Sequence, residues 1–240
     1  MKTVLITGAN KGIGFETAKQ LAQLGYFVYI GSRDKQNGLE AVEKLKALGL
    51  TNVDCIEIDV ANLTSVKQAR TELEAKIDAL DILINNAGIS GKQPQAFSTG
   101  DMENLRTLFD TNFFGTVQTT QQFIPLLEKA SHPVIVNVSS EVGSLTMHSS
   151  AARSANWDLF SAYGSSKTAL NAFTIMLANE LKNTAFRVNS VTPGYTATDL
   201  NQHQGVKTAE EGAKPIVRVA TQSDKVTTGK FYQASGEAAW

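Results

Sequence analysis

Short apolar segments and segments of helical periodicity alternate along almost the whole of this chain. The apolar segments predict strands at residues 3–6, 26–30, 53–58, 80–84, 134–138, 186–191 and 230–233. The helical patterns cover residues 14–24, 34–48, 63–77, 102–127, 163–181 and 208–220. Strands that are apolar throughout are typical of a parallel sheet that helices cover on both faces. The repeated strand–helix units therefore predict a doubly wound α/β fold.

Composition adds limits on the class of protein. No linker rich in glycine, serine or charge divides the 240 residues, so we expect a single domain over residues 1–240. The net charge of −1 gives no sign of a nucleic-acid or anionic-membrane partner. No apolar segment approaches the roughly 18 residues that a membrane span needs, and no secretory pattern begins the chain. The one cysteine, Cys55, leaves neither a disulfide nor a metal cluster, so we expect a cytoplasmic protein without a metal site.

A glycine-rich turn joins the first predicted strand to the first predicted helix. Residues 7–14 read TGANKGIG, which is a G-x-x-x-G-x-G spacing rather than G-x-G-x-x-G. Such glycines let a pyrophosphate approach the backbone, and the N-terminus of the following helix favours an anion. The turn predicts a dinucleotide site, and the alternative is a glycine-rich turn without a ligand. The expected contacts are Gly8, Asn10, Lys11, Gly12, Ile13 and Gly14.

The end of the second predicted strand indicates which dinucleotide binds. An acid at this place would accept hydrogen bonds from the ribose of NAD, but the chain has Ser32 and Arg33 here. Together with Asn10 and Lys11 they predict a cationic pocket for a 2′-phosphate, and hence NADPH. We interpret the adjacent Asp34 as the cap of the next helix, pointing away from the pocket. The alternative is that the two cations are solvated surface groups.

Two further strand ends are expected to face the same crevice. Asp59 and Val60 follow the third strand, and residues 85–88 (NNAG) follow the fourth. Ligands of an open parallel sheet bind outside the carboxyl ends of its strands. The paired asparagines also suit a turn that satisfies its own backbone, and both interpretations can hold together. The expected cofactor contacts in NNAG are Asn86, Ala87 and Gly88.

A tyrosine and a lysine with the spacing Y-x-x-x-K open the helix after the fifth strand. That strand ends in Ser139 and Ser140, and Tyr163 and Lys167 lie one helical turn apart on the same face. A phenol with an ordinary pKa of about 10 is a poor catalyst near neutrality, and a nearby ammonium is expected to lower that pKa. In this interpretation Tyr163 protonates the alkoxide formed when hydride reaches a ketone, and a serine hydroxyl steadies the same oxygen. By itself, Y-x-x-x-K usually indicates a tyrosine that packs and a lysine at the surface. Here the motif follows a strand that ends in serine, in a chain that also has the glycine-rich turn, and this combination favours catalysis.

Several short motifs occur in a fixed order along the chain. They are TGxxxGxG at 7–14, NNAG at 85–88, Asn112, Ser140, YxxxK at 163–167, and PG at 193–194. In this order they resemble the short-chain dehydrogenase/reductase family across nearly the whole chain. The segments NKGIG at 10–14 and TNFFGT at 111–116, with Trp240, are similar to its monomeric NADPH-dependent carbonyl reductases. The resemblance implies one Rossmann-type domain with a seven-stranded, mostly parallel sheet of order 3-2-1-4-5-6-7.

The resemblance also implies roles for matching residues. Asn112 would hold a water that links Lys167 to solvent, and Lys167 would bond the nicotinamide ribose. Asp59 and Val60 would contact adenine, and Asn86 its ribose. The catalytic set would be Asn112, Ser140, Tyr163 and Lys167, with Ser139 as the alternative serine; register with the family favours Ser140. Tyr163 and Lys167 would also touch the cofactor, as would residues after the sixth strand, which are Pro193, Gly194, Thr196 and Thr198.

The chain departs from many family members between Ser140 and Tyr163, which are 23 positions apart. The resemblance to the monomeric carbonyl reductases implies that a small insertion at about residues 142–160 covers the face through which relatives form tetramers, and therefore a monomer; the alternatives are a dimer or a tetramer. The insertion, Phe97 and residues 195–204 are expected to line the substrate pocket. Trp157 and Phe160, within the insertion, suit a core equally well, and His148 is expected at the surface rather than in catalysis.

These observations predict an NADP-dependent oxidoreductase that reduces ketones or aldehydes of small molecules to alcohols. The alternative enzyme is a biosynthetic 3-oxoacyl or steroid-type ketoreductase of the same family. A nucleotide-binding regulator without catalysis is a third hypothesis, but the presence of both Tyr163 and Lys167 speaks against it.

Overall fold

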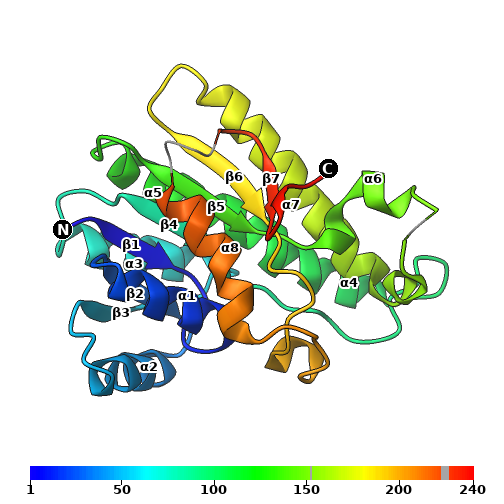
Figure 1. Cartoon of the computed structure of the whole chain (residues 1–240), viewed down its shortest axis with the longest axis horizontal. Coiled ribbons are helices and arrows are strands. Elements are labelled where there is room, and N and C mark those ends of the chain that lie inside the picture. Colours follow the sequence, from blue (N-terminus) through cyan, green and yellow to red (C-terminus); the bar gives the residue numbers. More distant parts are fainter. Residues whose placement is uncertain (152, 223–226) are drawn as a thin grey trace.

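A single eight-stranded sheet runs through the computed structural model, which describes residues 1–151, 153–222 and 227–240 (Figure 1). The strand order is β3-β2-β1-β4-β5-β6-β7-β8, and every neighbouring pair is parallel except β7 and β8. The strands are β1 (Thr3–Ile6), β2 (Phe27–Ser32), β3 (Val53–Glu57), β4 (Ile82–Asn85), β5 (Val134–Val138), β6 (Arg187–Val191), β7 (Phe231–Gln233) and β8 (Gly236–Glu237).

The order of the first seven strands confirms the prediction, but the expected count of seven is wrong. The chain turns back after β7, and β8 pairs antiparallel with it, Tyr232 opposite Glu237. A strand of two residues has no periodicity that could have been read from the sequence.

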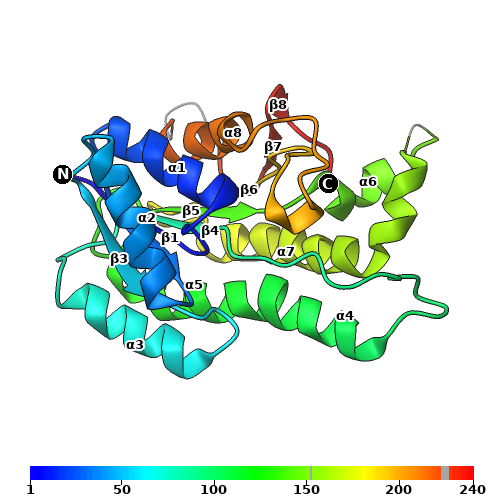
Figure 2. The same ribbon diagram turned by 90° about the horizontal axis from the view of Figure 1, so that it is seen from below.

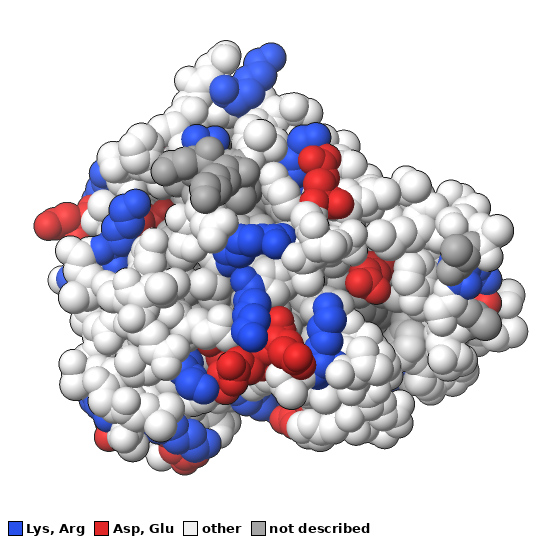
Figure 3. All heavy atoms as spheres, viewed as in Figure 1, with Lys and Arg blue, Asp and Glu red and all other residues white. Residues whose placement is uncertain are grey.

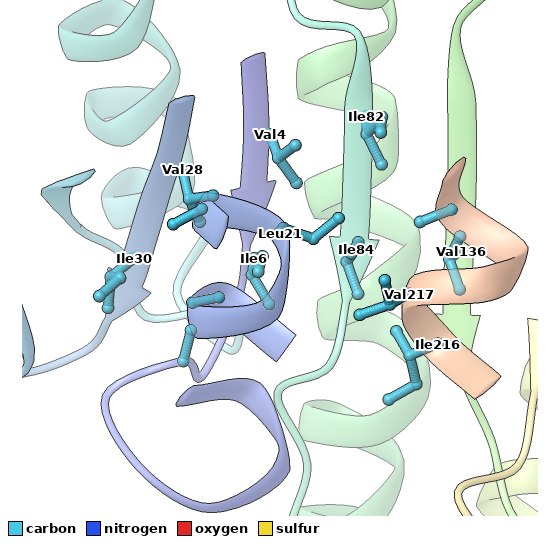
Figure 4. Close-up of a cluster of buried hydrophobic side chains, with 14 of the residues drawn as sticks. Val4, Ile6, Leu21, Val28, Ile30, Ile82, Ile84, Val136, Ile216 and Val217 are labelled. Carbon is cyan, nitrogen blue, oxygen red and sulfur yellow. The ribbon is translucent and has the colours of Figure 1, made fainter. Parts of the chain in front are cut away.

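Helices cover both faces of the sheet, as Figure 2 shows. One face carries α1 (Gly12–Gln23), α2 (Lys35–Ala47) and α8 (Ala209–Thr221), and the other carries α3 (Leu63–Glu74), α5 (Gly115–Leu127) and α7 (Ser161–Glu180). Successive strand residues point to opposite faces, so Val4 and Ile6 join the first core and Leu5 the second. Figure 4 shows the first core, where Leu21 of α1 and Ile216 of α8 meet the strands.

The long helix predicted at residues 102–127 is interrupted in the middle. It consists of α4 (Met102–Phe109), a π-helical turn η1 (Asp110–Phe114) and α5. Such turns widen a helix by one residue and often occur at functional sites. Asn112, the family-matched residue, lies in this turn and is fully buried.

Short elements fill the segment between Ser140 and Tyr163. They are the 3-10 turn η2 (Glu141–Gly143), α6 (Leu145–His148) and the 3-10 turn η3 (Ala155–Phe160). A further 3-10 turn, η4 (Asp199–Asn201), follows β6. Trp240 stacks on Phe231, with ring centroids 5.6 Å apart, and its carbonyl accepts a 2.7 Å hydrogen bond from the Thr146 N–H. The last residues of the chain thus brace the beginning of α6.

Within the described residues, no helix combines the length and the apolar character needed to cross a membrane.

Candidate active site

One large cleft lies at the carboxyl ends of the strands and has a volume of about 1390 Å³. All residues predicted to bind the cofactor line it, and so do Ser140, Tyr163 and Lys167. Asn112 does not line it. On the face shown in Figure 3, acidic and basic side chains are interspersed, and the surface is hollowed between the main body and the lobe on the right. The tertiary structure therefore brings the nucleotide motifs and the chemical motifs to one place.

The glycine turn packs directly against the end of β4. Gly8 has a φ of +62°, and a Cβ there would lie 2.9 Å from the Cα of Ala87. A Cβ on Gly14 would lie 2.5 Å from Nδ2 of Asn86, so a side chain fits at neither position. The Thr7 hydroxyl accepts hydrogen bonds of 3.0 Å from the N–H groups of Asn86 and Ala87. The Asn86 amide donates in turn to the carbonyls of Thr7 and Gly8.

This turn fits the pyrophosphate of a dinucleotide. Helix α1 begins at Gly12, so the N–H groups of its first turn lack helical partners and can bind an anion. Gly12, Ile13 and Gly14, which carry the first of these groups, all line the cleft.

The groups around the end of β2 agree with the prediction in part. Asp34 caps α2 as expected, since its Oδ1 accepts a 2.8 Å hydrogen bond from the Asn37 N–H. Ser32 is buried, and its hydroxyl donates to the carbonyl of Asp34 at 2.7 Å. Arg33 is exposed at the cleft, and no side chain of the described residues forms an ion pair with it. A free guanidinium at this place suits a phosphate.

Lys11 was expected to join Arg33 in the phosphate pocket, but its ammonium pairs with an acid. Its Nζ is 2.6 Å from Oδ2 of Asp199 in η4, and Nε2 of His203 is 2.9 Å from the other oxygen of that carboxylate. Lys11 and His203 together hold the pKa of Asp199 below its usual range. Sequence reasoning missed this contact because Lys11 and Asp199 are far apart along the chain. Lys11 therefore joins the glycine turn to the segment after β6.

Asp59, Val60 and Gly88 lie at the next strand ends. Oδ1 of Asp59 accepts a 3.0 Å hydrogen bond from the Ala61 N–H, and the carbonyl of Val60 accepts one from the amide of Gln118. A Cβ on Gly88 would lie 3.5 Å from Nζ of Lys167, so this backbone lies directly against the chemical end.

The chemical end consists of Tyr163 and Lys167 on α7, with Ser140 after β5. Nζ of Lys167 donates a 2.9 Å hydrogen bond to the carbonyl of Val138 and lies 5.7 Å from the centroid of the Tyr163 ring. The hydroxyl of Ser140 bonds the phenol of Tyr163. Ser139 is buried instead, and its hydroxyl lies 3.5 Å from the carbonyl of Lys167. Of the two serines, Ser140 is the one that faces the tyrosine.

Burial controls the protonation of both catalytic groups. It raises the pKa of Tyr163 to about 12, and the hydrogen bond with Ser140 opposes this rise only in part. It also lowers the pKa of Lys167 to about 8. The direction for Tyr163 is opposite to the expected one, because desolvation of the phenolate outweighs the hydrogen bond with Ser140. A phenol with this pKa keeps its proton at neutral pH and is available as a donor.

Asn112 lies behind the cleft and holds the loop after β4. Its Oδ1 accepts a 2.9 Å hydrogen bond from the Ile89 N–H, and its Nδ2 donates to the Ile89 carbonyl and to the Ser166 hydroxyl at 3.0 Å each. The side chain is thus committed to neighbouring protein groups. Its contacts are those of a positioning residue that ties β4 to α7.

The substrate side of the cleft is lined by aromatic residues. Tyr195 lines the cleft as expected, and so do Trp157 and Phe160, for which a place in the core was the alternative. Phe97 does not, although it was expected to, because its side chain is 65% exposed away from the cleft. His148 supports the wall: its Nε2 lies 2.8 Å from the Val142 carbonyl, and its ring centroid is 5.1 Å from that of Trp157.

Sequence reasoning missed two residues of this site. Gln95 is buried; its Oε1 accepts a 2.9 Å hydrogen bond from the Tyr163 N–H, and its Nε2 donates to the Ser90 carbonyl at 2.6 Å. It therefore holds the first turn of α7, but nothing in the loop sequence marks it. Glu141 follows Ser140 directly and lines the cleft. Its position beside the serine was a signal that could have been used.

Comparisons with known proteins agree with this site. The family described as short chain dehydrogenase matches residues 2–209. The chain is 32% identical to salutaridine reductase of Papaver bracteatum over 98% of this chain and 95% of the relative. The structure of salutaridine reductase from Papaver somniferum superposes with a TM-score of 0.84 at 31% identity, covering 97% of this chain and 99% of that one. A variant of ElxO with NADPH bound gives 0.83 at 26% identity, with 97% and 96% covered.

The fold, the glycine turn and the serine–tyrosine–lysine arrangement all point to the same conclusion as these matches. The chain belongs to the short-chain dehydrogenase/reductase family and is an oxidoreductase that uses a nicotinamide cofactor.

Proposed function

We propose that this protein reduces ketones or aldehydes of small molecules to alcohols with NADPH. The observation that carries the proposal is the meeting, in one cleft, of a glycine-lined nucleotide end with Ser140, Tyr163 and Lys167. The salutaridine reductase of Papaver bracteatum, similar over almost its whole length, is named for a reduction.

The cofactor would lie along the strand ends. The glycine turn and the first turn of α1 would hold its pyrophosphate, Asp59 and Val60 its adenine, and Asn86 the adenosine ribose. Lys167 would bond the nicotinamide ribose, while Pro193, Gly194, Thr196 and Thr198 would close the other side. When bound, the nicotinamide supplies a hydride to the carbonyl carbon.

Tyr163 and Ser140 would act on the carbonyl oxygen. The serine hydroxyl donates a hydrogen bond to that oxygen as negative charge builds up, and the phenol gives it a proton. The raised pKa of Tyr163 supports this direction, since a reductase needs the protonated phenol. Lys167, held in place by the Val138 carbonyl, then helps to restore the proton on Tyr163. Asn112 fixes the backbone around them.

The preference for NADPH over NADH rests on Arg33. The guanidinium is exposed at the end of β2 without an ion pair to the described residues, and Asp34 is turned away into its helix cap. A 2′-phosphate would give Arg33 a partner of the right charge and geometry. The matched ElxO structure contains NADPH, which supports the same choice. The Lys11 ammonium would bind the 2′-phosphate only if its ion pair with Asp199 broke.

Three broader expectations remain part of the proposal. These are a single domain over residues 1–240 with an insertion at about 142–160, a monomer, and a cytoplasmic location. The short elements η2, α6 and η3 support an insertion. Light scattering tests the monomer, and a stable tetramer would contradict it.

The test of the function is turnover of small aromatic ketones and diketones by the purified protein with NADPH. Tyr163→Phe should lower kcat by about a hundredfold to ten-thousandfold, because general acid catalysis contributes on this scale. Binding of NADPH by this variant, followed by fluorescence, should be retained and serves as the control. A panel of acyl thioesters distinguishes the 3-oxoacyl alternative. Full activity of Tyr163→Phe, or turnover of thioesters alone, would overturn the proposal.

A further inference from the structure

Glu141 is a charged residue of the cleft that the reaction described above does not use. It begins η2, directly after Ser140, and is only partly buried. Among the described residues, none forms a hydrogen bond or an ion pair with its carboxylate. A carboxylate inside a cleft, next to a residue of the reaction centre, is therefore available to a bound molecule.

The backbone that carries Glu141 is firmly held. The Gly143 carbonyl accepts hydrogen bonds from the Thr168 hydroxyl at 3.0 Å and from the Asn171 amide at 3.2 Å, both on α7. A Cβ on Gly143 would lie 2.8 Å from Cβ of Lys167, so η2 packs directly on the catalytic helix. The carboxylate thus starts from a backbone whose position relative to Tyr163 and Lys167 is fixed.

The surroundings of Glu141 suit a cation that has apolar substituents. Trp157, Phe160 and Tyr195 line the same cleft as Glu141, and aromatic faces attract ammonium groups. The other charged residues that line the substrate side are Asp101, Glu103 and Lys92. Together with Glu141 they make three acids against Lys92, besides the catalytic Lys167. Few charged side chains surround the hollow in Figure 3.

We propose that Glu141 is a specificity-determining residue, and that it selects carbonyl substrates that carry a cationic ammonium group. This inference rests on the proposed reduction and names its substrate class. The carbonyl oxygen would meet Ser140 and Tyr163, while the ammonium group would lie between the Glu141 carboxylate and the aromatic wall. A cation in this place gives the carboxylate a partner and replaces part of the hydration that each ion loses.

The experiment compares two isosteric ketones with wild type and with Glu141→Gln. One aryl ketone carries a trimethylammonium group, and the other carries a tert-butyl group of the same shape. Each protein is described by the ratio of kcat/KM for the cationic ketone to that for the neutral one, which cancels differences in active protein. We expect a wild-type ratio above one and a fall of about tenfold in Glu141→Gln, as for the loss of one contact between charged groups.

A matched control removes one negative charge elsewhere. Glu180 is exposed at the far end of α7 and does not line the cleft, so Glu180→Gln should keep the wild-type ratio. Phenyltrimethylammonium should also inhibit reduction of the neutral ketone, and should do so more weakly in Glu141→Gln. An unchanged ratio and unchanged inhibition in Glu141→Gln would overturn this inference and leave the reduction intact. Failure of wild type with both ketones would instead overturn the proposed function.

Discussion

The nucleotide end and the substrate end of the cleft are built in different ways. At the nucleotide end, the Thr7 hydroxyl and the Asn86 amide bond the backbone of the facing segment, and the glycines leave no space for side chains. At the substrate end, the segment between Ser140 and Tyr163 consists of short turns with large exposed side chains, such as Leu159 at 56%.

This contrast follows from what each end has to bind. A cofactor of constant shape suits a rigid backbone cradle, in which the chain itself makes the contacts. A substrate pocket made of side chains on a loop can change residue by residue without disturbing the sheet. We expect substitutions at the nucleotide end to affect cofactor binding strongly, and substitutions at the substrate end to affect one substrate relative to another.

Gly14→Ala tests the nucleotide end, and of the changes that bear on this contrast it should have the largest effect, a loss of affinity for NADPH. The added methyl group would lie 2.5 Å from Nδ2 of Asn86, so the turn must shift. We expect about a tenfold to hundredfold weaker binding of NADPH, measured by fluorescence titration, because overpacking costs about 1–3 kcal/mol. The control is Gly25→Ala at the other end of α1, where a Cβ meets nothing within 4 Å and φ is +85°. That variant should lose stability but retain its affinity for NADPH. Equal losses of affinity in both variants would contradict the claim that the glycine turn forms a rigid site for the cofactor.

Arg33→Ala should change which cofactor is used rather than whether one binds. Losing a charged hydrogen bond to the 2′-phosphate should raise KM for NADPH by about tenfold and leave KM for NADH nearly unchanged. Lys35→Ala removes a neighbouring exposed cation that does not line the cleft and is the matched control. If Lys35→Ala changes the preference for NADPH over NADH as much as Arg33→Ala does, the preference comes from the general positive charge of this region and not from a specific contact of Arg33 with the 2′-phosphate.

Trp157→Ala tests the substrate end. Removing this aromatic wall should raise KM for an aromatic ketone by about threefold to tenfold and leave KM for NADPH unchanged, since aromatic contacts contribute about 0.5–1.5 kcal/mol. The other tryptophan of the chain is the control, because Trp240 packs on Phe231 and does not line the cleft. Trp240→Ala should lower the melting temperature with little change in KM. A raised KM for NADPH in Trp157→Ala would show that the two ends are not separate.

The smallest effect concerns pH. Burial lowers the pKa of Lys167 to about 8, so its ammonium is lost as pH rises through that value while Tyr163 keeps its proton. The kcat for ketone reduction should therefore fall about twofold between pH 7 and pH 8, and more steeply above it. A steady-state pH profile measures this, and a kcat that stays level up to pH 10 would contradict the role given to Lys167.

The lowered pKa of Lys167 also makes the stability of the protein depend on pH. Between pH 8 and 10.5 the unfolded chain binds a proton at this lysine that the folded protein has released. The contribution of Lys167 to the free energy of unfolding therefore rises with pH over this window. Replacement by methionine should remove this dependence, as urea unfolding at several pH values would show.

Much of the fold follows from local pattern. The strand of residues 134–138 was predicted with the bounds that β5 has, and the order of seven strands is as expected. The pattern could not show β8, since two residues have no periodicity, or the π-helical turn η1, since one extra residue hardly disturbs the helical repeat of apolar positions. The motifs also identified the residues that meet in the cleft, because glycine turns and strand ends lie at fixed places of this fold.

Local sequence thus determined the elements, the kind of cofactor end and the pairing of Tyr163 with Lys167 on one helical face. Only the tertiary structure decided what lies against those groups: Asp199 beside Lys11, Gln95 bonded to the Tyr163 N–H, and, among the described residues, no group bonded to the Glu141 carboxylate. It also decided the direction of the Tyr163 pKa, which rises because burial removes water from the phenolate. Contacts and desolvation depend on residues distant in the chain, and no local pattern contains them.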